Sequence, residues 1–211
     1  MYLGEIKIQA LSLMYPDASV RYDDSTPEGI ERAVYEMKAD HNFSGLLEAT
    51  VGSVNRAFSV IETMRLTHQS CADVRLSECK RTKDGRVEIP LPPDCLLPER
   101  LYCHRGSSTY ECDLNIRGGK AYTDRVCELY TVIYRGKIPR IKRVTPDSYS
   151  VDLDDALCEA IPYFVMGELL SREEPKRAKE AREHFDKALS ECEVMDAPCH
   201  QCFNIVYSAE W

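Results

Sequence analysis

The sequence lacks an apolar run long enough to cross a bilayer, and it contains a single tryptophan. A membrane-spanning helix needs about 18 or more consecutive apolar residues. Glu5 and Lys7 lie where a secretory signal would carry its apolar stretch. We therefore expect a soluble protein that is made in the cytoplasm and makes no contact with a membrane.

The chain also lacks an excess of basic residues, because 27 Lys and Arg face 35 Asp and Glu, for a net charge of -8. Affinity for duplex DNA comes mostly from Lys and Arg that neutralise phosphates, so an acidic chain is a poor general DNA binder. Such a balance suits a surface along which DNA moves without adhering.

One basic cluster stands out against this background. Its members are Arg135, Lys137, Arg140, Lys142 and Arg143. It could bind phosphates, it could pair with an acidic neighbour, or it could protect a solvated edge strand from aggregation.

No catalytic signature is present. Gly118-Gly119-Lys120 lacks the earlier glycine and the following Ser or Thr of a phosphate loop, and Asp152-x-Asp154-Asp155 lacks the glycine and glutamate of a calcium loop. No cysteine lies in the glycine-containing turn that usually presents a catalytic nucleophile. We therefore expect no enzymatic activity and no cofactor.

Ten cysteines are many for a chain of this kind, and we expect most of them to be reduced and buried as small apolar side chains. Cys199 and Cys202 form one CxxC pair, whereas structural zinc usually takes four ligands. The other ligands would have to be Cys71 with Cys79, or Cys103 with His104. We predict no metal site, and a Cys/His metal module or small enzyme is the alternative.

Hydrophobic residues recur every three to four positions up to about residue 68, alternate from about 86 to 134, and return to helical spacing from about 153 to 192. The strongest helix begins near Asn42 or Ser44. Its apolar seam is Leu47, Val51, Val54, Phe58 and Ile61. Gly52 inside this helix suggests a close helix crossing.

The middle of the chain predicts five or six short strands. Asp84-Gly85 and Gly118-Gly119 are turn signals, and residues 91–97 read as an extended loop or an edge. Residues 110–117 read as one half-buried strand, and residues 138–144 as a further strand. Together they indicate a small antiparallel sheet or barrel.

The predicted fold class is α+β: a helical bundle formed by the N- and C-terminal segments, with an inserted small antiparallel β domain and an extended C-terminal arm. The predicted parts are residues 1–70 and 151–192 for the bundle, 71–150 for the β domain and 193–211 for the arm. The apolar residues of the arm are Phe203, Ile205, Val206, Tyr207 and Trp211. They could fold onto the protein's own surface or dock on a partner.

Four stretches carry a resemblance. They are Asn42 to Arg65 with Ser53-Val54-Asn55-Arg56-Ala57, then Val87 to Asp94, Leu129 to Pro139, and Ala156 to Leu170 with Gly167-Glu168-Leu169-Leu170. In their residue pattern and in their order along the chain, these stretches resemble the head-to-tail adaptor (connector) proteins of tailed bacteriophages.

The resemblance implies a structural virion protein that assembles in the host cytoplasm. It implies a ring, dodecameric on the portal protein, that also contacts tail or nozzle proteins. DNA would pass through its channel during ejection without specific binding, and Cys199 to Trp211 would dock on the portal. A β domain that binds a small ligand is a further alternative.

Overall fold

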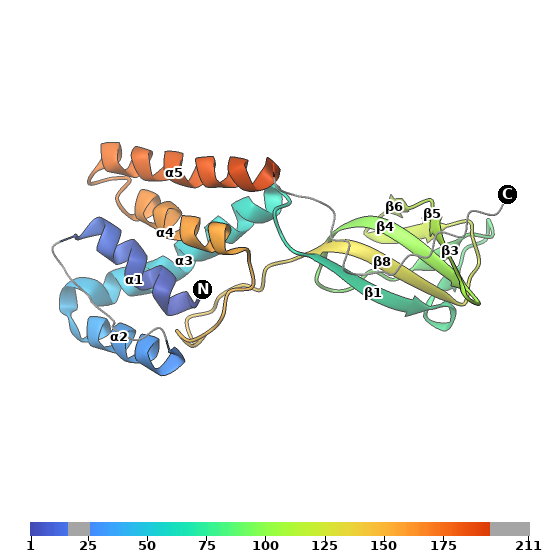
Figure 1. Cartoon of the computed structure of the whole chain (residues 1–211), viewed down its shortest axis with the longest axis horizontal. Coiled ribbons are helices and arrows are strands. Elements are labelled where there is room, and N and C mark those ends of the chain that lie inside the picture. The colour runs from blue at the N-terminus through green and yellow to red at the C-terminus, as the bar shows by residue number, and fades with distance from the viewer. Residues whose placement is uncertain (17–25, 195–211) are drawn as a thin grey trace. The chain divides into compact units, whose positions relative to one another are not determined.

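A computed structural model describes residues 1–16 and 26–194, which fall into two units. Within the described residues, the helical unit contains residues 1–66 and 138–194, and the β unit contains residues 67–137. Figure 1 shows helices from both ends of the chain in one unit and strands from its middle in the other. The chain is α+β, as the change of period predicts.

The helical unit contains five helices within the described residues. They are α1 (Leu3–Met14), α2 (Pro27–Ala39), α3 (His41–Thr63), α4 (Asp155–Leu169) and α5 (Pro175–Val194). Helix α4 packs against α1, α3 and α5, so it lies at the centre of the unit. None of the helices in the described part of the chain has both the length and the apolar character that crossing a bilayer requires.

Local signals set the helix starts. The Thr26 hydroxyl accepts the Gly29 N–H at 3.2 Å, with Pro27 in the first turn of α2. Helix α3 begins earlier than predicted, because the Asp40 carboxylate accepts the Asn42 N–H at 2.8 Å and caps the helix. Asn42, near which the helix was predicted to begin, therefore lies inside the first turn.

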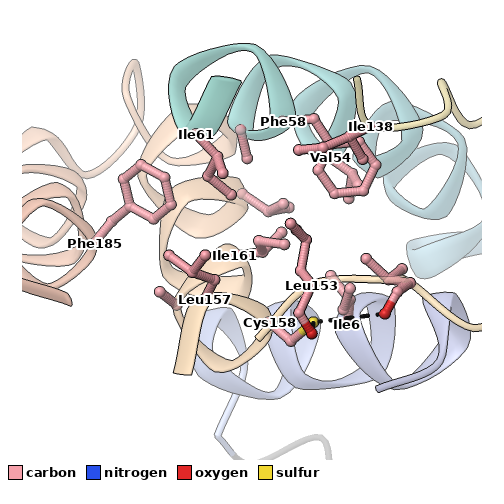
Figure 2. Close-up of a cluster of buried hydrophobic side chains, with 14 of the residues drawn as sticks. Ile6, Val54, Phe58, Ile61, Ile138, Leu153, Leu157, Cys158, Ile161 and Phe185 are labelled. Carbon is pink, nitrogen blue, oxygen red and sulfur yellow. Dashed lines mark hydrogen bonds between the residues drawn. The ribbon is translucent and has the colours of Figure 1, made fainter. Parts of the chain in front are cut away.

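The main core of the helical unit forms where the apolar seam of α3 meets α1, α4 and α5. Phe58, Ile61 and Ile161 are fully buried there. Figure 2 shows these side chains around one centre, with Phe185 of α5 closing one side and Ile138 the other. The Cys158 thiol donates to the backbone carbonyls of Val151 and Leu153, and burial raises its pKa to about 11, so it remains a thiol at neutral pH.

Residues 67–137 of the β unit form two antiparallel four-stranded sheets. One has the order β1–β8–β4–β5 and the other β2–β3–β7–β6. The strands are β1 (Gln69–Arg75), β2 (Lys80–Arg81), β3 (Val87–Ile89), β4 (Cys95–Arg105), β5 (Ser108–Cys112), β6 (Asn115–Arg117), β7 (Lys120–Thr123) and β8 (Leu129–Gly136). A short 3-10 helix, η1 (Leu76–Glu78), follows β1. Apolar residues of both sheets share one core around the fully buried Tyr130.

Two strand predictions were wrong in extent. Residues 110–117 form β5 and β6, which belong to different sheets and are separated by Asp113 and Leu114. Strand β4 begins at Cys95, inside the stretch predicted as an extended loop or an edge, and it contains Pro98. Strand β5 pairs with β4 only from Leu101 onward, so the missing N–H of Pro98 removes no bond to that neighbour.

The strand predicted for residues 138–144 does not form. Ile138 and Ile141 are both buried in the core of the helical unit, three positions apart, which alternation in a strand would not allow. The predicted β domain of residues 71–150 is consequently too long at its C-terminal end, since residues 138–150 pack with the helices.

Candidate functional site

Segment 138–151, which re-enters the helical unit after the β unit, is held by polar side chains of α3. The Asn55 amide donates to the Ile141 carbonyl at 2.8 Å and accepts the Ile141 N–H at 2.9 Å. The Glu62 carboxylate accepts the Ile138 N–H at 2.9 Å and also pairs with Arg140. These side chains supply the hydrogen bonds that a neighbouring strand would otherwise provide.

The same segment continues onto α1 through a buried ion pair. The Lys7 ammonium lies 2.5 Å from one Asp147 carboxylate oxygen, and both side chains are almost completely buried. Lys38 of α2 binds the other oxygen at 3.0 Å, and the Gly4 N–H donates to the Asp147 carbonyl at 2.7 Å. A Cβ at Gly4 would overlap Ile30 of α2 and lie 3.1 Å from the Asp147 carbonyl oxygen. Glycine at this position therefore allows α1 to approach both residues closely.

Helix α3 also binds α4 through charge. The Arg56 guanidinium donates to the Glu168 carboxylate, with Nε at 2.6 Å, and to the Ser53 hydroxyl at 3.0 Å. The hydrogen bond to Glu168 raises the pKa of Arg56 further above its usual value, against the opposing effect of burial. Arg56 and Glu168 belong to the first and fourth stretches of the resemblance, which therefore contact each other.

In the β unit, the second and third stretches meet at Asp94. The Tyr134 hydroxyl donates to both Asp94 carboxylate oxygens, at 3.1 and 3.2 Å, and the Lys137 N–H donates to the Asp94 carbonyl at 2.7 Å. Burial, together with the hydrogen bond to Asp94, raises the pKa of Tyr134 to about 12.

The five residues of the basic cluster lie in both units. Arg135 and Lys137 belong to the β unit, whereas Arg140, Lys142 and Arg143 belong to the helical unit. Arg135 pairs with Glu99 at 2.8 Å, Arg140 with Glu62, and Arg143 with Glu48 at 3.9 Å. Three of the five therefore have acidic partners in their own unit, and the edge strand on which one interpretation relied is absent. A contact with another molecule stays a prediction.

The predicted docking arm lies outside the described residues. That part of the chain includes Phe203, Ile205, Val206, Tyr207 and Trp211, together with Cys199 and Cys202 of the CxxC pair.

The cysteines differ in part from the expectation. A disulfide joins Cys103 to Cys127, 24 residues apart, so these two are exceptions to the expectation that most cysteines are reduced. The free cysteines of the described residues are Cys71, Cys79, Cys95, Cys112, Cys158 and Cys192. Only Cys112 and Cys158 among them are buried, and Cys71 is exposed. Across residues 1–16 and 26–194, no three His, Cys, Asp or Glu side chains converge in a way that could hold a metal ion.

A polar network that the sequence did not predict crosses one whole sheet of the β unit. The Thr131 hydroxyl donates to Asp73 at 2.6 Å and contacts His104 Nε2 at 2.8 Å, while His104 Nδ1 lies 3.0 Å from the Thr109 hydroxyl. Each residue comes from a different strand. The Gly106 turn is the available signal, since a tight hairpin there places Thr109 opposite His104.

A nucleophilic site would place a carboxylate directly on the imidazole, whereas here the Thr131 hydroxyl lies between His104 and Asp73. Thr109 is also exposed on the sheet, and neither it nor His104 lines the pocket of the β unit. The network is therefore better explained as a cross-strand ladder that fixes the register of four strands.

That pocket, of about 300 Å³, lies where β4, β5 and the loop before β8 meet. Its lining residues are Cys103, Arg105, Tyr110, Arg125, Val126 and Cys127. The helical unit has a larger hollow of about 520 Å³ between α1 and α4, beside Tyr163. Tyr163 also stacks on His184 of α5, with ring centroids 5.0 Å apart.

Comparison with known proteins finds no family model that matches the chain and no significant match among curated proteins.

Proposed function

We propose that the protein is a structural component of a tailed-bacteriophage virion, a head-to-tail adaptor that assembles as a ring on the portal. One observation carries the proposal: the four stretches of the resemblance are joined by specific side-chain bonds. Arg56–Glu168 joins the first to the fourth, the Glu62 bond to Ile138 joins the first to the third, and Asp94–Tyr134 joins the second to the third.

These bonds support the proposal because they tie the resemblance to the architecture of the chain. Each one joins residues far apart in the sequence through a charged or polar side chain, so each holds distant segments of a unit together. Two of the bonds strengthen the helical unit and one strengthens the β unit, and an adaptor needs such internal bonds in order to keep its shape under load.

The acidic balance fits a ring around passing DNA, since a net charge of -8 repels phosphates. The role requires no reaction, so the protein acts as a structural part and carries no active site. Its partners are the portal protein, tail or nozzle proteins and further copies of itself. Residues 199–211 supply the arm that docks on the portal.

The test mixes the purified chain with the assembled portal ring encoded by the same genome. We expect co-sedimentation and, by cryo-electron microscopy, twelve copies on a dodecameric portal. A variant with Phe203, Tyr207 and Trp211 changed to serine should remain folded and lose binding. Asn204→Ser is the matched control and should bind as the original chain does.

Two failures have different meanings. If the unaltered chain does not bind the intact portal ring, the adaptor function is wrong. If the triple serine variant binds as well as the original, the docking role of the arm is wrong while the adaptor function stands.

A further inference from the structure

Two arginines line the pocket of the β unit beside exposed apolar residues. Arg105 ends β4, and Arg125 lies in the loop between β7 and β8. Tyr110 and Val126 line the same hollow and are 47% and 44% exposed, unusually open for such side chains. The disulfide between Cys103 and Cys127 lies in its wall.

The loop that carries Arg125 is fixed in place from several sides. The Arg125 N–H donates to the Thr123 hydroxyl at 3.3 Å, and the Arg125 carbonyl accepts a hydrogen bond from the Tyr130 hydroxyl at 2.9 Å. The same Tyr130 oxygen accepts the Cys127 N–H at 2.9 Å, and Cys127 is covalently tied to β4. A buried tyrosine and a disulfide thus hold Arg125 and Val126 at the surface, which lowers the ordering cost of binding.

Both arginines lack an acidic partner among the described residues, in contrast to their neighbours. Arg86 binds Asp124 at 2.9 Å, so the carboxylate next to Arg125 in the sequence is already engaged. Lys120 is paired with Glu88, and Arg135 with Glu99. Among the described residues that line the pocket there is no carboxylate, so none of these side chains neutralises the two arginines.

We propose that this pocket binds an acidic segment of a partner protein, with a carboxylate between Arg105 and Arg125 and an adjacent apolar side chain against Tyr110 and Val126. Guanidinium groups recognise carboxylates through paired charge-assisted hydrogen bonds. A DNA backbone would need a longer basic track than one pocket with two cations offers on an acidic protein. The proposal does not depend on the adaptor function.

The experiment is a chemical-shift titration of the full chain with the blocked peptide acetyl-Asp-Phe-Asp-amide. We expect shifts confined to the residues around Arg105, Tyr110, Arg125 and Val126, and weaker binding as salt is raised. Arg105→Gln and Arg125→Gln should each weaken binding by about tenfold or more, because each removes a charge-assisted contact. Arg117→Gln, in the β6–β7 hairpin away from the pocket, is the matched control and should bind normally.

Three results would overturn the proposal. The neutral peptide acetyl-Asn-Phe-Asn-amide could bind equally well, the two arginine variants could bind as the original chain does, or a single-stranded oligonucleotide could bind the same residues more tightly than the acidic peptide. Unchanged spectra of the β unit outside the pocket establish that the glutamine variants are folded.

Discussion

The side chain of Asn55 forms two hydrogen bonds with the backbone of Ile141, one to its carbonyl at 2.8 Å and one from its N–H at 2.9 Å. Asn55 lies in the middle of α3, and Ile141 lies just after the chain returns from the β unit. Because Ile141 is almost fully buried, its peptide groups have no ready access to water. A single amide therefore fixes where the returning chain enters the core.

We predict that Asn55→Ala destabilises the helical unit by about 2 kcal/mol, because it leaves two buried backbone groups without partners. Ser59→Ala, one turn further along the same helix, removes an exposed hydroxyl and should change stability by less than about 0.5 kcal/mol. Urea unfolding followed by circular dichroism at the helical band measures both. Equal effects of the two substitutions would contradict the assigned role of Asn55.

Two helical glycines give a matched pair. A Cβ at Gly167 would lie 2.9 Å from Arg182 Cγ and 3.1 Å from the Ala178 carbonyl oxygen, where α4 crosses α5. A Cβ at Gly52 would meet only the end of the Arg56 side chain, at 3.4 Å. We predict that Gly167→Ala destabilises the protein by about 1–3 kcal/mol through overpacking.

Gly52→Ala should instead stabilise it by about 0.5–1 kcal/mol, because alanine has the higher helix propensity. Thermal unfolding of the two variants is the measurement. A stabilised Gly167→Ala variant would show that α4 and α5 are not closely packed at that point.

The disulfide gives a prediction for the β unit. A disulfide that closes a loop of 24 residues lowers the entropy of the unfolded chain, which stabilises the folded protein by about 3 kcal/mol. The variant in which Cys103 and Cys127 are both alanine should lose about that much stability in amide hydrogen exchange of β4 and β8. Exchange in α3 and α4 should not change. Finding both thiols free in the unreduced chain by mass spectrometry after alkylation would contradict the bond.

Glu99 gives a prediction for pH. Burial raises its pKa, but hydrogen bonds from Arg135 and Gln69 lower it more, so its pKa lies below the ordinary value in the folded chain. A carboxylate with a lowered folded pKa adds stability above its unfolded pKa of about 4.3, and this contribution is lost as the pH falls through the folded pKa.

We therefore expect Glu99→Gln to weaken the β unit by about 1 kcal/mol at pH 7, and the difference from the original chain to shrink below about pH 4. The exposed Glu128→Gln is the control and should show no such dependence. Hydrogen exchange of β1 and β8 across this pH range decides the matter. A difference that persists at pH 2 would assign the effect of Glu99 to packing.

The helices were predictable because one physical signal dominates them. Val54, Phe58 and Ile61 recur at helical spacing, and their burial alone determines which face of α3 points inward. Gly52 shows the limit of this reasoning, since a glycine in a helix can lie at a close helix crossing or at a position where no neighbouring helix is near. Only the packing of the neighbouring helix distinguishes Gly52 from Gly167.

The strand errors have a common origin. Alternation of apolar and polar residues continues from β5 into β6, so the sequence gives no sign that the chain passes from one sheet to the other at Asp113. In segment 138–144 the apolar residues resemble a strand, but Asn55 and Glu62 supply the hydrogen bonds. Partners so distant in the sequence cannot be recognised from local pattern.

The pocket was not predictable for the same reason. Arg105 and Arg125 are 20 positions apart and belong to no basic cluster, while Arg135, which does, is bound to Glu99. The charge that matters for recognition is the charge left unpaired after folding, and composition does not reveal it.

The core of the helical unit draws on both ends of the chain, and this has a consequence for synthesis on the ribosome. The whole of residues 67–137 emerges before α4 does, so the β unit can close while α1 to α3 still lack the helix that covers their apolar faces. The apolar faces of α1 to α3 thus remain accessible to chaperones and to other nascent chains until α4 and α5 have been synthesised.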